Sequence, residues 1–140
     1  MKGAAAVAEI LKREGVKFLI GYPINPIIEA AAEADIRTII VRQERTGLHM
    51  ADGFSRVSSG QRIGVFTMQW GPGSENSFGG VAQAFGESVP IVVLPGGHSR
   101  DLINIPPKIF LCIVIANILD HLSYPFYIVG KFTVFNFFTK

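Results

Sequence analysis

Helical and strand-like hydrophobic patterns alternate along the first hundred residues or so, and this alternation constrains the fold more than any other feature of the chain. Amphipathic or alanine-rich stretches predict helices at residues 4–14, 27–34, 46–59 and 75–86. Short apolar runs predict strands at residues 16–20, 38–41, 63–68 and 91–94. Such an alternation with short connections is typical of a parallel sheet covered by helices on both faces. We therefore expect a three-layer αβα fold of the α/β class, in which a mostly parallel sheet lies between two layers of helices.

Local signals within the first third of the chain support this pattern. Val7, Ile10 and Leu11 would share one face of the first helix. Asn25 offers an N-cap side chain for the second helix, and Pro26 suits the first helical turn, where its missing N–H has no partner to lose.

A functional site is expected at one edge of this sheet. Right-handed crossovers place every strand-to-helix loop on the same edge, and ligands of such folds bind there, outside the carboxyl ends of the strands. The loops concerned are residues 21–23, 42–44 and 69–73. Glu44 follows a strand and opens a helix, where backbone N–H groups favour a negative charge. From spacing alone, an ordinary first-turn helix acid remains the simpler interpretation of Glu44.

Residues 71–76, Gly-Pro-Gly-Ser-Glu-Asn, predict a tight turn that leads into a helix. Glycines let the backbone approach a ligand closely, and a helix start can hold an anion. A dinucleotide fingerprint, however, would need a glycine at Asn76 and would follow the first strand rather than the third. By itself the motif therefore favours an ordinary strand-to-helix turn at least as much as a binding site.

Composition and charge argue against several classes of function. The formal net charge is +2 without a basic patch, so a nucleic-acid partner is not expected. A single cysteine, Cys112, excludes an intrachain disulfide, and the N-terminus shows no signal-peptide pattern, so a cytoplasmic location is expected. His49 and His98 have no cysteine or acidic partner at ligand spacing, and no metal site is predicted in this chain.

The last part of the chain, residues 108–140, differs from what precedes it, because it is rich in phenylalanine and loses the strand–helix alternation. Its apolar stretch, residues 109–119, is shorter than the roughly 20 residues that a membrane-spanning helix needs. A membrane span is therefore not expected, and a buried strand at residues 109–115 is the simpler prediction. The predicted organisation is a partial domain over residues 1–107, followed by an apolar, divergent tail.

Five short motifs occur in an order and at spacings that resemble the acetolactate synthase-like family of thiamin-diphosphate enzymes. They are Gly21-Tyr22-Pro23, Val41-Arg42-Gln43-Glu44, Ala51-Asp52-Gly53-Phe54-Ser55-Arg56, Gly71-Pro72-Gly73-Ser74-Glu75-Asn76 and Ser88-Val89-Pro90-Ile91-Val92. The resemblance is to the N-terminal, pyrimidine-binding domain of that family and covers residues 1–107. It implies the thiamin-diphosphate-binding fold, here incomplete at its C-terminus, because the family pattern stops after Pro107.

The resemblance also implies roles for individual residues. In this family the glutamate that matches Glu44 hydrogen-bonds the aminopyrimidine ring of the cofactor and favours the tautomer that removes the thiazolium C2 proton. Glu44 is therefore the expected catalytic residue and also a cofactor-binding residue. Tyr22, Pro23, Pro72 and Asn76 are expected to line the pyrimidine pocket.

The expected cofactor is thiamin diphosphate, with a 2-oxo acid as substrate, and some relatives also retain FAD. Magnesium and the diphosphate would be held by a second domain, whose Gly-Asp-Gly motif does not occur in these 140 residues. Since family members form the site between domains of two subunits, a homo-oligomer, at least a dimer, is expected for a full-length protein. The chain is thus predicted to be the pyrimidine-binding portion of a decarboxylase or carboligase, inactive without a diphosphate-binding domain.

Two departures from the family pattern argue against acetolactate synthase as the activity itself. The family commonly has His-Glu-Gln where this chain has Gln43-Glu44-Arg45, so a histidine near the substrate is missing. Glycines usually follow the Gly-Tyr-Pro motif, whereas Ile24-Asn25-Pro26 follow here. The abrupt change at Lys108 indicates a truncated or frame-shifted member of the family. One half of a split enzyme and a non-enzymatic interaction domain are the alternatives.

Overall fold

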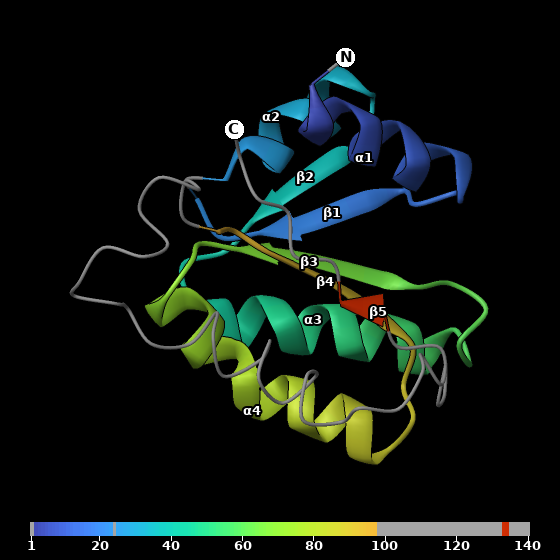
Figure 1. Cartoon of the computed structure of the whole chain (residues 1–140). Helices are drawn as coiled ribbons and strands as arrows, with labels where there is room; N and C mark the ends of the chain where they lie inside the picture. The colour runs from blue at the N-terminus through green and yellow to red at the C-terminus, as the bar shows by residue number, and fades with distance from the viewer. Residues whose placement is uncertain (1, 24, 98–132, 135–140) are drawn as a thin grey trace, which may run out of the picture.

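The computed structural model describes residues 2–23, 25–97 and 133–134 (Figure 1). The predicted helices are present, with small shifts at their ends: α1 (Gly3–Arg13), α2 (Pro26–Glu33), α3 (Glu44–Val57) and α4 (Pro72–Gly86). The predicted strands are present too, and a short one is added: β1 (Phe18–Gly21), β2 (Arg37–Ile40), β3 (Gly64–Met68), β4 (Ile91–Pro95) and β5 (Thr133–Val134). The largest shift is at α4, which begins at Pro72 because a proline fits the first helical position.

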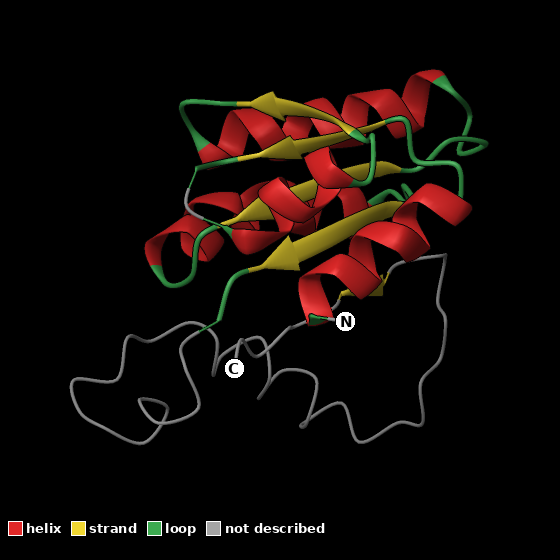
Figure 2. Cartoon of the chain, turned by 90° about the horizontal axis from the view of Figure 1, so that it is seen from above, coloured by secondary structure: helices red, strands yellow, loops and turns green. Residues whose placement is uncertain are grey.

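The sheet has the strand order β2-β1-β3-β4-β5, and every neighbouring pair is parallel. In Figure 2 the arrows of the four longer strands point the same way. The two residues of β5 come from the apolar tail and pair with Val92 and Val93 of β4. The predicted strand at residues 109–115 and the predicted boundary after residue 107 lie outside the described residues.

Helices cover the sheet on both faces, which confirms the predicted three-layer α/β fold. Helices α1 and α2 pack together on one face, and α3 and α4 pack together on the other (Figure 1). The core on the α3/α4 side is built from Ile20, Val41, Leu48, Ala51, Phe66, Met68, Ala84, Val89, Ile91 and Val93. The core on the α1/α2 side is built from Val7, Leu11, Leu19, Ile27, Ala31, Ile36, Val65 and Leu94.

Helix α1 packs through a slightly different face from the one predicted. Val7 and Leu11 are buried as expected, but Ile10 is 58% exposed and Ala8 is buried instead. Helix α1 packs against α2 as well as against the core, so its buried stripe includes Ala8 and leaves Ile10 outside. None of the helices in the described part of the chain is long and apolar enough to cross a membrane.

An ion-pair network links α3 to the end of α4. The Arg56 guanidinium donates to the buried carboxylate of Asp52 over 2.7 Å and also pairs with Glu87. Hydrogen bonds to Asp52, and then to Glu87, hold the pKa of Arg56 above its already high ordinary value. The guanidinium therefore stays charged at every pH at which the protein is handled, and its ion pair with Glu87 links α3 to the end of α4.

The loops after β1 and β3 leave the sheet toward opposite faces. The chain after β1 turns to α2, whereas the chain after β3 turns to α4, and β1 and β3 are neighbours in the sheet. This arrangement is a topological switch point, the place where open α/β sheets bind their ligands. The fold therefore directs attention to the carboxyl ends of β1 and β3.

Candidate functional site

Glu44 lies at this edge as the first residue of α3. The preceding residue, Gln43, has an extended backbone and makes no side-chain cap, so Glu44 begins the helix next to its unpaired backbone N–H groups. Its side chain is only 5% exposed. A carboxylate at a helix N-terminus is stabilised by the helix dipole, which offsets part of the cost of burying its charge.

Asn76 holds one oxygen of this carboxylate. The Asn76 amide donates from Nδ2 to Oε2 of Glu44 over 3.1 Å, and so joins the start of α4 to the start of α3. Within residues 2–23 and 25–97, no side chain or backbone group donates to the other oxygen, Oε1. Asn76 thus orients the carboxylate and leaves Oε1 available for a ligand.

The Gly-Pro-Gly turn shapes the space beside Oε1. Gly71 has a φ of 66°, a left-handed conformation that glycine adopts without strain, and Pro72 then starts α4. A Cβ atom at Gly73 would lie 3.1 Å from Oε1 of Glu44 and 2.8 Å from Cγ of Gln69. These distances leave no room for a side chain at position 73, and glycine there lets the start of α4 pack closely against Gln69 and Glu44.

Tyr22 and Pro23 lie at the same edge, on the loop after β1. The backbone N–H of Tyr22 donates to the carbonyl of Thr67 over 3.0 Å, and the partly buried Tyr22 ring packs against the core on the α3/α4 side. Pro23 is exposed and lines a small cavity of about 350 Å³ with residues of α2 and β2. Neither residue hydrogen-bonds Glu44. The structure thus brings Glu44 into contact with Gly73 and Asn76, whereas Tyr22 and Pro23 lie on the other side of the switch point.

Two polar residues at this edge carry more interactions than the sequence indicated. Asn25 was expected only as an N-cap, and its side chain does accept from the backbone N–H of Ile27 over 3.2 Å. The same side chain also bonds Thr67, a fully buried residue that the sequence gives only as part of an apolar strand. Nothing in the sequence signals this pair, since Asn25 has the pattern of an N-cap and a threonine suits a strand as well as valine does.

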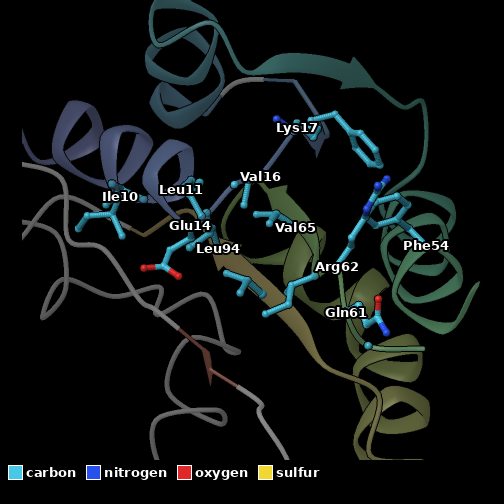
Figure 3. Close-up of a pocket in the computed structure, with 16 residues that line it drawn as sticks. Ile10, Leu11, Glu14, Val16, Lys17, Phe54, Gln61, Arg62, Val65 and Leu94 are labelled. Atoms are coloured by element: carbon cyan, nitrogen blue, oxygen red, sulfur yellow. The ribbon is translucent and has the colours of Figure 1, made fainter. Parts of the chain in front are cut away.

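A larger cavity, of about 700 Å³, lies at the opposite edge of the sheet (Figure 3). Its lining comes from the end of α1, the segments that precede β1 and β3, and side chains of β3 and β4 such as Val65 and Leu94. It lies at the amino ends of the strands, away from Glu44. In the described ranges no three His, Cys, Asp or Glu side chains gather as a metal site would require. His49 is exposed on α3, and His98 lies outside the described residues.

Comparison with known proteins decides the family. The family model described as the N-terminal TPP binding domain of thiamine pyrophosphate enzymes matches residues 1–119. The chain belongs to this family. The probable acetolactate synthase large subunit of Methanocaldococcus jannaschii is 39% identical over 107 residues, which are 74% of this chain and 18% of that protein. The acetolactate synthase large subunit of Haemophilus influenzae and isozyme 3 of Escherichia coli are each 35% identical over 108 residues.

This member of the thiamine pyrophosphate enzyme family spans about a fifth of the length of those curated relatives. The match covers all five motifs and therefore the whole of the Glu44 site. The residues present fit an aminopyrimidine ring through their hydrogen-bonding groups: a buried carboxylate, held at Oε2 by Asn76, has no donor at its second oxygen within the described residues. Such an oxygen can accept a hydrogen bond from a ring nitrogen.

Replacing Gly73 by alanine tests this fit. Stability should fall by about 1–3 kcal/mol, because the new Cβ would lie 2.8 Å from Cγ of Gln69, an atom close to the backbone that has little freedom to move away. Binding of thiamin diphosphate should weaken at least ~10-fold, since the new methyl group would lie 3.1 Å from Oε1 and displace the Glu44 carboxylate. The matched control is Gly79→Ala on the same helix, where a Cβ meets nothing within 4 Å. Equal affinities for the two variants, measured by calorimetry, would contradict the assignment.

Proposed function

We propose that this chain supplies the pyrimidine-binding carboxylate, Glu44, of a thiamin-diphosphate-dependent enzyme that decarboxylates or ligates 2-oxo acids. The observation that carries the proposal is the geometry of Glu44: buried, held at Oε2 by Asn76, and without a donor at Oε1 among the described residues. The family match over residues 1–119 supports thiamin diphosphate as the ligand. The relatives named as acetolactate synthases support a 2-oxo acid as the substrate class.

Each residue of the site has a distinct task in this proposal. Glu44 accepts a hydrogen bond from the protonated ring nitrogen at Oε1 and so keeps a proton on that nitrogen. Asn76 fixes the carboxylate through Oε2, and Gly73 lets α4 begin in close contact with Glu44. Tyr22 and Pro72 form the walls on either side of the switch point. Thiamin diphosphate, when bound, supplies the electron sink that decarboxylation of a 2-oxo acid requires.

The remaining half of the site would come from outside these 140 residues. The chain has no Gly-Asp-Gly motif, and none of the five residues assigned here would hold magnesium or a diphosphate. A diphosphate-binding region, elsewhere in the same protein or in a second subunit, would supply both. On this proposal the 140 residues alone bind the cofactor weakly and turn over no substrate, and cytoplasmic location, oligomerisation and retention of FAD remain predictions.

The surroundings of Glu44 favour a decarboxylase or carboligase other than acetolactate synthase. Gln43 takes the place of the family's histidine, and its side-chain oxygen accepts from Thr46 Oγ1 over 3.3 Å at the helix surface. Gln43 is exposed and has no titratable group, so it cannot move protons at the substrate. Any proton transfer at the substrate would therefore need a group other than residue 43.

The direct test is binding of thiamin diphosphate labelled with ¹⁵N in its aminopyrimidine ring to the 140-residue chain. A hydrogen bond from the ring nitrogen to Glu44 should shift that nitrogen's NMR resonance in a saturable way, with a dissociation constant near the millimolar range because the diphosphate has no anchor. Thiamin without its diphosphate should bind about equally well. A resonance that never moves with protein concentration would refute the proposal. Turnover of a 2-oxo acid after addition of a diphosphate-binding chain would support the split-enzyme alternative.

A further inference from the structure

Asn25 lies where the two loops of the switch point diverge. It follows β1 and begins the turn into α2, whereas the residues it contacts are at the end of β3. Its side chain therefore crosses from the loop that carries Tyr22 and Pro23 to the strand that leads into the Gly-Pro-Gly turn. These are the two sides between which the aminopyrimidine ring is proposed to bind.

All the hydrogen-bonding groups of the Asn25 side chain are engaged. Nδ2 donates to Oγ1 of Thr67 over 2.7 Å and to the carbonyl of Met68 over 3.0 Å, while Oδ1 accepts from the backbone N–H of Ile27. An N-cap needs only the acceptor, which Asp, Ser or Thr would also provide. The two donor bonds are therefore not needed to start α2, and they join the loop after β1 to β3.

The network continues to the next strand. Thr67 is fully buried, and its hydroxyl accepts from Asn25 and donates to the carbonyl of Leu94 in β4 over 2.8 Å. The carbonyl of Met68 also accepts from the backbone N–H of Gly96 over 2.8 Å. Asn25 and Thr67 consequently tie the carboxyl ends of β1, β3 and β4 together beneath the proposed pocket, and we call this pair the crossbeam.

We infer that Asn25 is a positioning residue, which sets the distance between the loop after β1 and the loop after β3 and so the fit of the aminopyrimidine ring against Glu44. The inference rests on the proposed function. Asn25 touches no cofactor group itself; it acts through Thr67 and Met68. Asn25 stands in the segment where glycines usually follow the Gly-Tyr-Pro motif, and a glycine there could not make these side-chain bonds.

Asn25→Asp separates the two tasks of the residue. Aspartate keeps the acceptor that caps α2 but loses both donors and turns a carboxylate oxygen toward the carbonyl of Met68. Thr67→Val breaks the same network from the other end with nearly unchanged volume, and Thr67→Ser, which retains the hydroxyl, is its matched control. We expect Asn25→Asp and Thr67→Val each to weaken thiamin diphosphate binding ~10-fold, and Thr67→Ser to stay within ~2-fold of the unchanged chain.

The double variant distinguishes a shared network from general destabilisation. If the crossbeam acts as one unit, Asn25→Asp combined with Thr67→Val should weaken binding by far less than the product of the single effects. At saturating thiamin diphosphate, the ring-nitrogen resonance of both single variants should also move back toward its value in solution, because the hydrogen bond from the ring nitrogen to Oε1 is no longer well aligned. Multiplicative effects with an unchanged resonance would overturn the inference, as would wild-type affinity in Asn25→Asp.

A measurement without cofactor keeps this inference separate from the proposed function. The Nδ2 protons of Asn25 should exchange with solvent far more slowly than those of an exposed amide, and Asn25→Asp should shift the backbone resonances of both Tyr22 and Gln69. If these results hold but the unchanged chain binds no thiamin diphosphate, the crossbeam stands and the proposed function fails. Fast exchange of the Asn25 amide would refute the crossbeam whatever the cofactor does.

Discussion

Glu44→Gln should slow exchange of the C2 proton of bound thiamin diphosphate with solvent by at least ~100-fold, the usual range for loss of an acid–base group. Glutamine has nearly the same shape and can still accept from Asn76 through its oxygen. Its second group is then an NH₂ facing the ring nitrogen, which donates a hydrogen bond where the carboxylate accepted one. The ring nitrogen can no longer keep its proton, although the shape of the site is nearly unchanged.

The measurement is proton–deuterium exchange at C2, followed by NMR at several cofactor concentrations and extrapolated to saturation. Extrapolation separates the loss of exchange from any change in affinity, which should be less than ~5-fold. Glu75→Gln is the matched control, since Glu75 is an exposed acid at the start of α4 and its loss changes the net charge equally. Undiminished exchange in Glu44→Gln would show that the carboxylate has no part in activating the cofactor.

Much of this site follows from the order of elements along the chain. The alternation of helix and strand places the loops that carry Tyr22, Glu44 and the Gly-Pro-Gly turn on one edge, and parallel pairing then brings them together. Placing these loops at one edge requires only the order of the elements and not the distances between them. The ligand could not be predicted in the same way, because spacing alone favoured an ordinary first-turn helix acid at Glu44. Only the resemblance of five motifs connected Glu44 to an aminopyrimidine ring.

What the sequence did not predict depends on distances between elements. Asn25 has the pattern of an N-cap, and nothing in the sequence near it shows that its amide reaches Thr67, which is 42 residues later. Thr67 does not stand out in the sequence of its apolar strand, because a β-branched hydroxyl residue suits a strand as well as valine does. Ile10 satisfies the helical period of α1, but α1 also packs against α2, and the structure buries Ala8 in its place.

Gly64 is a further residue whose importance only the structure reveals, and Gly64→Ala should destabilise the fold by more than about 4 kcal/mol. A Cβ at this first residue of β3 would lie 2.1 Å from the carbonyl oxygen of Ala51 and 2.6 Å from its carbonyl carbon. Both atoms are backbone of α3, so no side chain can rotate away. The N–H of Gly64 also donates to the buried Ser55 hydroxyl over 2.8 Å, which fixes β3 and α3 at this close approach.

Relief of this clash requires the whole of α3 to move away from the sheet, and the cost is a large part of the roughly 5–15 kcal/mol that stabilises a typical domain. Urea denaturation should show the loss, with Gly53→Ala as the control, because a Cβ on that α3 residue meets nothing within 4 Å. A change below ~1 kcal/mol in Gly64→Ala would mean that α3 is not held at this distance. Since the same helix begins with Glu44, any Gly64→Ala protein that still folds should also lose thiamin diphosphate binding, because a shift of α3 separates Glu44 from Asn76.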